Sequence, residues 1–217
     1  MGSVAQPEFG DTGATVARVE GHTEDRELLA EYRQRLRLVR VPKSGGSPDI
    51  VIEVLNDDGC LAGATSYVHE EFPLAASDYS RRIAESLDSV VVRVSTQAMA
   101  DVASFDHKAV AAALHDDFVQ LDFRQLGYPD LDRAGFLEAL DAQSDIIRVW
   151  LTQAIHAAGR DVHVGAGSLW TLHYGQWTPL TQGIFVNVSK GGQWARLEIY
   201  PDEQLDVALR RFSELTA

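Results

Sequence analysis

The sequence contains a single cysteine, Cys60, among 217 residues. One cysteine cannot form an internal disulfide, and its neighbours lack the spacing of a metal site. Cys60 is therefore expected to be a buried or half-buried spectator beside a turn. The sequence also lacks a glycine-rich phosphate loop and a serine nucleophile elbow, which argues against nucleotide transfer and the familiar hydrolases. No metal and no cofactor are predicted.

Positive charge is scarce as well. Lys and Arg number 19 against 32 Asp and Glu, which gives a net charge of −13. Nucleic-acid affinity depends largely on neutralising phosphates with basic side chains, so nucleic acid is not an expected partner. The one basic cluster, EYRQRLRLVR at 31–40, alternates with apolar residues, which is typical of a strand with one solvated face.

Long apolar runs are missing too. No segment approaches the roughly 20 apolar residues that cross a bilayer. The first residues, MGSVAQPEFGDTG, have neither the basic nor the apolar part of a secretory signal. We expect no membrane partner and a soluble cytoplasmic protein, whose 45% hydrophobic content is enough for a packed core.

What the sequence does contain is an internal repeat. Residues 36–41 and 50–67, with the run to about Arg82, align without a gap on 169–174, 183–200 and the run to Leu215, at an offset of 133. Gly59 then meets Gly192 and Tyr67 meets Tyr200. The shared order is strand, strand, glycine turn, strand and amphipathic helix, which predicts a duplication whose first copy is truncated.

Hydrophobic periodicity and turn signals predict an α+β protein. Residues 1–13 are expected to be a disordered tail. The predicted strands are 14–21, 34–42, 49–56, 60–68, 118–124, 146–156, 161–174, 183–189 and 193–200. The predicted helices are 74–87, one from about 92, a short one capped by Asp106, one capped by Asp132, and a final one after Pro201.

Two segments carry a family resemblance. HDDFVQLDFRQLGYPDLDRAGFLEAL at 115–140 and GGQWARLEIYPDEQLDVALRRF at 191–212 resemble the SnoaL-like branch of the nuclear-transport-factor-2-like superfamily. The resemblance is to tandem copies appended to large bacterial cyclase-like and ATPase-type regulators. It implies a cone-shaped, curved antiparallel sheet with packed helices. Residues 89–217 would form a complete domain, and 14–88 a truncated repeat made of strands and one helix. Phe123 stands where relatives often have histidine.

The predicted cone makes a concave apolar pocket, the usual place for a ligand. Alternation along 118–124 puts Phe118, Gln120, Asp122 and Arg124 on one face. Asp122 in such a pocket is a candidate general base, as the pocket Asp of family isomerases and cyclases also implies. Alternatively, Arg124 holds Asp122 as a structural ion pair.

Other candidates come from the later strands. His163 and His173 share a strand face if no bulge intervenes, and His163 or Tyr200 is a candidate partner of Asp122. The remaining candidate pocket residues are Trp170, His173 and Glu198. Trp170, Trp177, Trp194 and Tyr200 could form an aromatic wall for a planar ligand, although core and dimer packing are commoner uses of such residues.

Two functions remain open from the sequence. The first is a non-catalytic ligand-binding or protein-interaction module of the regulatory kind, with a small apolar pocket. The second is a cofactor-independent isomerase, cyclase or hydratase, or an epoxide-hydrolase-like enzyme, with Asp122 as general base. A small hydrophobic ligand is expected in either case. The resemblance together with the surplus aromatics predicts self-association, as a dimer through an open sheet face, unless the first repeat already occupies that face.

Overall fold

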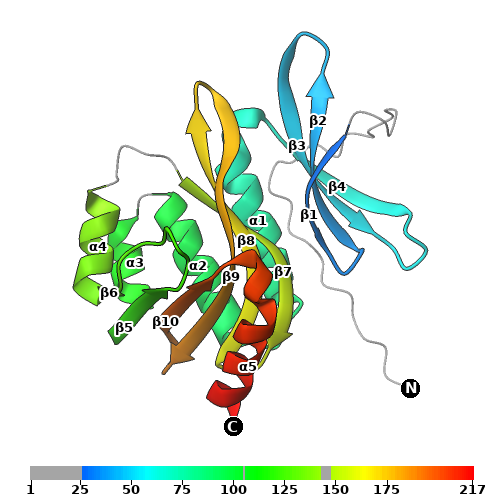
Figure 1. Cartoon of the computed structure of the whole chain (residues 1–217). Helices are drawn as coiled ribbons and strands as arrows, with labels where there is room; N and C mark the ends of the chain where they lie inside the picture. Colours follow the sequence, from blue (N-terminus) through cyan, green and yellow to red (C-terminus); the bar gives the residue numbers. More distant parts are fainter. Residues whose placement is uncertain (1–25, 105, 143–147) are drawn as a thin grey trace.

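The computed structural model describes residues 26–104, 106–142 and 148–217. The strands are β1 (Glu27–Tyr32), β2 (Leu36–Lys43), β3 (Gly46–Leu55), β4 (Leu61–Tyr67), β5 (Leu114–Asp122), β6 (Leu131–Asp132), β7 (Arg148–Ala158), β8 (Val162–His173), β9 (Gln176–Lys190) and β10 (Gln193–Tyr200). The helices are α1 (Phe72–Glu85), α2 (Val90–Ala103), α3 (His107–Ala113), α4 (Arg133–Asp141) and α5 (Leu205–Thr216), with short 3-10 turns η2 (His69–Glu71) and η3 (Asp202–Gln204). The predicted α+β class, a curved antiparallel sheet with packed helices, is confirmed (Figure 1). No helix among these residues is long and apolar enough to span a membrane.

The first unit is an antiparallel sheet in the order β1-β2-β3-β4, followed by α1. The turn between β3 and β4 forms as the NDDG signal predicts, because Gly59 adopts a φ of 75° and the Asn56 side chain accepts from the amides of Asp58 and Cys60. Three predicted strands and the helix are confirmed to within a few residues. Strand β1 was not predicted, and the strand predicted at 14–21 lies outside the described residues.

The second unit is a six-stranded sheet in the order β6-β5-β10-β9-β8-β7. Only β5 and β10 run parallel, and the other neighbours are antiparallel. Both predicted helix caps form, since Asp106 accepts from Ala109 N at 2.9 Å and Asp132 from Gly135 N at 2.8 Å. Helices α2 and α4 pack on one face of the sheet, over Phe118, Trp194 and their neighbours.

Helix α5 covers the opposite face of this sheet, along β8 and β9 (red in Figure 1). Its predicted apolar stripe packs on Val164, Val186 and Tyr200, with Ala208 at the centre of the contact. Beneath the helix, Glu198 is 1% exposed and accepts from Tyr200 Oη at 2.8 Å, from Arg196 at 2.7 Å and from Arg211 at 3.2 Å. The carboxylate is therefore satisfied by groups that fix α5 to β10.

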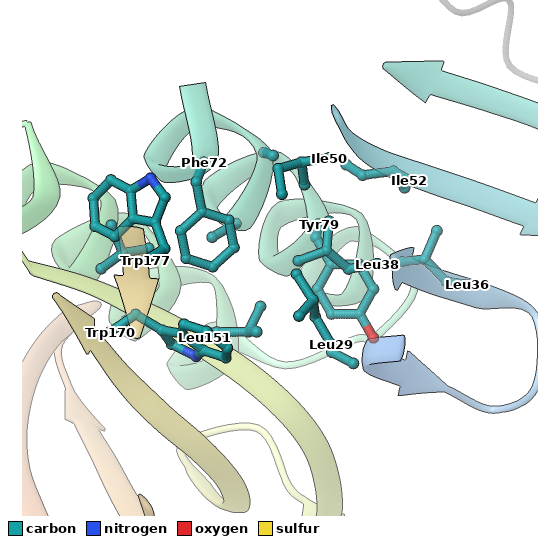
Figure 2. Packing of buried hydrophobic residues seen from close by; sticks show 14 of the residues in the cluster. Leu29, Leu36, Leu38, Ile50, Ile52, Phe72, Tyr79, Leu151, Trp170 and Trp177 are labelled. Atoms are coloured by element: carbon teal, nitrogen blue, oxygen red, sulfur yellow. The ribbon is translucent and has the colours of Figure 1, made fainter. Parts of the chain in front are cut away.

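A shared core joins the two units. Figure 2 shows side chains of β1, β2, β3 and α1 meeting Leu151, Trp170 and Trp177 of the second unit. Phe72, the first residue of α1, has its ring centre 5.4 Å from that of Trp170 and 5.2 Å from that of Trp177. Trp177 Nε1 also donates to the His69 carbonyl at 3.0 Å. The two units therefore bury one another's apolar surface.

The two units share a strand order. Strands β1 to β4 and then α1 follow the sequence of pairings seen in β7 to β10 and then α5. In the last hairpin of each unit, Ile50 pairs with Tyr67 and Ile184 with Tyr200, so the two tyrosines lie within one residue of the predicted correspondence. This order agrees with a duplication, which stays a prediction.

The ungapped offset of 133 fails at the preceding hairpin. Leu36 pairs with Val54, but Leu169, the residue 133 positions further on, pairs with Thr181. The turn glycines Gly45 and Gly175, both at positive φ, are 130 positions apart rather than 133. A turn that shifts by three residues moves the pairing of both flanking strands, so β2 and β8 do not match in the predicted register.

Candidate functional site

A cavity of about 170 Å³ lies between α2, α4 and the inner face of the six-stranded sheet. Its walls are mainly apolar. The lining residues include Val92, Met99, Val102, Phe136, Leu140, Trp150, Phe185, Trp194, Leu197 and Ile199. A concave, mostly apolar cavity with few polar groups is the usual form of a small-molecule site.

The polar groups of the inner wall form a row across the sheet. Gln120 on β5 pairs with Leu197 on β10, Leu197 with Asn187 on β9, and Asn187 with His163 on β8. Directly paired residues of neighbouring strands point to the same face, and all four line the cavity. Gln120, Asn187 and His163 are all buried. We refer to these three residues as the polar row.

A hydrogen-bond chain fixes the state of His163. Trp194 Nε1, which can only donate, lies 2.9 Å from Asn187 Oδ1, so the Asn187 amide nitrogen must face His163 Nε2 at 3.2 Å. Nε2 is therefore an acceptor, and the proton of the neutral ring is on Nδ1. Burial lowers the pKa of His163 to about 4. His163 is thus a neutral wall residue near pH 7.

Asp122 is held by four hydrogen bonds. Arg124 donates from Nε at 2.9 Å and from Nη2 at 2.6 Å, and the backbone amides of Arg124 and Tyr128 donate at 3.1 and 2.9 Å. Burial alone would raise the pKa of Asp122, but these bonds outweigh it and hold the pKa below its usual value. Gly127 completes the enclosure, because a Cβ there would lie 2.4 Å from Asp122 Cγ. This is the ion-pair arrangement that the D-x-R spacing predicts.

Three of the predicted pocket residues, Gln120, Arg124 and His163, line the cavity. Phe118 lies on the same face but is packed between Phe136 and Trp194 in the core. Phe123 faces away and stacks on Tyr200 with ring centres 4.8 Å apart. The alternation predicted for 118–124 is therefore correct.

Four other predicted pocket residues lie elsewhere. Glu198 and Tyr200 alternate with the lining residues of β10, so they point under α5, where burial and the Glu198 bond raise the pKa of Tyr200. Trp170 belongs to the core shared with the first unit. His173 keeps the strand alternation of His163, because the register shift near Leu169 places its extra residue, Leu180, in β9. It lies exposed at the end of β8, beside the β8–β9 turn, and does not line the cavity.

The sequence reasoning missed Asn187 and the α2 wall. Asn187 becomes relevant only once the β8–β9 register places it opposite His163. The part of the cavity wall that α2 forms could have been predicted from the sequence. Val92, Ser95, Met99 and Val102 recur at helical spacing, which places them on one face of the helix. Within the described ranges, no group of three or more His, Cys, Asp and Glu side chains could hold a metal ion.

No protein family and no curated protein match the chain. Solved structures do resemble it. Δ5-3-ketosteroid isomerase from a Mycobacterium species is 19% identical, with 54% of this chain and 95% of that chain covered and a TM-score of 0.46. A Mycobacterium tuberculosis protein in complex with estradiol-17β-hemisuccinate is 16% identical, with 54% and 96% covered and a TM-score of 0.46.

An epoxide hydrolase of Mycobacterium tuberculosis is 16% identical, with 57% of this chain and 91% of that chain covered and a TM-score of 0.41. All three similarities extend over little more than half of the chain. The function is therefore inferred from the cavity and its own residues.

Proposed function

We propose that this chain is a non-catalytic binding module, which holds a small, mostly apolar molecule in the cavity of the second unit and serves a regulatory or protein-interaction role. The observation that carries the proposal is the cavity itself, with apolar walls from two helices and a sheet and only a few buried polar groups. A site of that composition gains its affinity from apolar burial and its orientation from the polar groups.

The state of the two best candidate catalysts supports a binding role. A general base needs a free lone pair and a pKa near the working pH. The Asp122 carboxylate accepts four hydrogen bonds and has a lowered pKa. His163 has a pKa of about 4 and uses Nε2 to accept from Asn187, so it is a weak base near pH 7.

The alternative is a cofactor-independent isomerase, cyclase, hydratase or epoxide-hydrolase-like enzyme with Asp122 as general base. Asp122 shares the face of β5 that carries Gln120, which favours this reading, although Asp122 itself is not among the residues that line the cavity. It requires the carboxylate to release Arg124 when substrate binds. Turnover of a small ketone or epoxide that Asp122→Asn abolishes, with unchanged thermal stability, would favour the enzyme.

The binding proposal is tested by filling the cavity. Ala139 on α4 lines the cavity, whereas Ala134 on the same helix is exposed, so Ala139→Phe and Ala134→Phe are a matched pair. Titration with toluene, followed by the fluorescence of Trp150 and Trp194, should show binding to wild type and Ala134→Phe. Ala139→Phe should weaken binding at least about tenfold, since the ring takes the space of the ligand. Equal binding to all three proteins would place the toluene elsewhere.

The family resemblance also predicted self-association as a dimer. The outer face of the six-stranded sheet, through which a dimer was expected, carries α5 on β8 and β9 and meets the first unit at β7. With that face covered, we expect a monomer. Light scattering at micromolar concentration checks this, and a dimer mass would mean that another surface associates.

A further inference from the structure

The polar row contains one side chain that borders the cavity and has no hydrogen-bond partner among the described residues. Gln120 is 5% exposed and lines the cavity. Its amide makes no hydrogen bond to any described residue, and neither amide atom is among those fully enclosed without a partner. Buried amide donors and acceptors are normally hydrogen-bonded, and those of Gln120 are not sealed off by protein. The cavity side is where a partner can reach it.

The rest of the row differs in this respect. Asn187 is occupied by Trp194 and His163. His163 Nδ1 has no partner among the described residues but is fully enclosed by protein, so a ligand cannot reach it without a shift of the wall. Gln120 is therefore the polar group of the row that a ligand can contact directly.

The size of the cavity limits what that ligand can be. A cavity of about 170 Å³ is close to the roughly 150 Å³ of an engineered apolar cavity that accommodates benzene. A single substituted ring matches this volume.

The charge around the row limits the ligand further. Gln120 and Asn187 are uncharged, and His163 accepts a hydrogen bond at Nε2 in its neutral form. The nearest charges along β5, Asp122 and Arg124, compensate each other at 2.6 Å. Nothing on the row itself offsets a net charge, and an uncompensated charge is expensive to bury. Arg148 also lines the cavity, but it is already engaged, with Nη1 donating to Tyr128 Oη at 3.5 Å.

We propose that the cavity selects a molecule the size of one substituted ring, whose uncharged polar group both donates to and accepts from the Gln120 amide. This inference rests on the proposed binding function and adds the ligand class to it. A carboxamide is the simplest such group, because two amides can pair through two hydrogen bonds, and a hydroxyl can make either bond singly.

Three one-ring probes separate the contributions. Toluene has no polar group, benzamide has a neutral donor and acceptor, and benzoate is charged at pH 7. Dissociation constants are measured by calorimetry or by Trp fluorescence for wild type, for Gln120→Leu and for Gln125→Leu, a control at an exposed glutamine. Thermal melts confirm that each variant is folded.

We expect Gln120→Leu to raise the dissociation constant of benzamide about tenfold, since the buried ligand amide loses its partner. The constant for toluene should stay the same or fall, and Gln125→Leu should change neither. Benzoate should bind at least about tenfold more weakly than benzamide to wild type.

The outcomes distinguish this inference from the proposed function. Toluene binding with a benzamide affinity that Gln120→Leu leaves unchanged overturns the role of Gln120 but keeps the binding module. Benzoate binding as tightly as benzamide overturns the requirement for a neutral group. Failure of all three probes to bind wild type overturns both proposals.

Discussion

Asp122 shows how much a single side chain is constrained in this fold. Its side chain has no exposure and that of Arg124 has 14%, so the pair is effectively internal. Arg124 also donates to Thr181 Oγ1 at 2.7 Å, which ties the end of β5 to β9. The D-x-R spacing predicted the ion pair. The contributions of Gly127 and the Tyr128 amide could not be predicted, because they depend on the path of the loop after the strand.

Breaking this pair should cost stability. We expect Asp122→Asn to lower the free energy of unfolding by about 3 kcal/mol, because Arg124 is left with an uncompensated buried charge. Arg124→Met should cost a similar amount, and the double variant should cost less than the sum of the two. Urea denaturation of the four proteins measures this. Single variants within about 0.5 kcal/mol of wild type, together with lost turnover, would instead support catalysis by Asp122.

His163 predicts how stability depends on pH. Its pKa is about 4 in the folded protein and about 6.5 in the unfolded chain, so the unfolded state binds more protons between these values. The stabilisation that neutral His163 contributes to the free energy of unfolding is complete above about pH 6.5. It is lost as pH falls to 4, by roughly 3 kcal/mol in all. Urea denaturation between pH 7 and pH 4 should show that the free energy of unfolding falls less for His163→Gln than for wild type. The exposed His156→Gln is the control and should follow wild type.

Single strands decide which face each residue occupies. On β10, Leu197 and Ile199 line the cavity while Glu198 and Tyr200 meet α5. The alternation along β10 was visible in the sequence. Which of the two alternating sets of residues points into the cavity, however, depends on the neighbouring strands and on a bulge after Trp194. The prediction of Glu198 and Tyr200 as pocket residues was wrong for this reason, whereas the parity on β5 was correct.

Helix α5 offers a test at the scale of one element. Phe212 lies in the apolar stripe of α5 and is half-buried against the sheet, while Ser213 beside it is exposed. We expect Phe212→Ala to cost about 1–3 kcal/mol, less than a fully buried phenylalanine, and Ser213→Ala to cost almost nothing. Urea denaturation of both variants measures these costs. Equal stability of the two variants would mean that α5 is not packed on the sheet.

The element order of the whole chain was largely predictable, because most strands and helices have clear periodicity and capping residues. Strand β1 was missed, since ELLAEY has no strict alternation and contains good helix formers. The start of β9 was missed because Pro179 and Gly183 resemble breakers. The position of the first unit against β7 and Trp177 could not be predicted, because it depends on contacts between distant segments.

The last prediction concerns the role of the first unit in the molecule. Val149 and Leu151 of β7, with Trp170 and Trp177, are buried by side chains of the first unit, and Phe72 is 0% exposed at the centre of that core. A core shared in this way couples the two units, so the chain should unfold in one transition by both circular dichroism and Trp fluorescence.

Phe72→Ala should lower the stability of the whole chain by about 3–5 kcal/mol, while Leu74→Ala, an exposed neighbour on α1, should have little effect. Residues 89–217 expressed alone should bind a hydrophobic dye and aggregate, because four apolar side chains lose their cover. Two separate transitions, with the second unchanged by Phe72→Ala, would show instead that residues 89–217 fold as an independent domain.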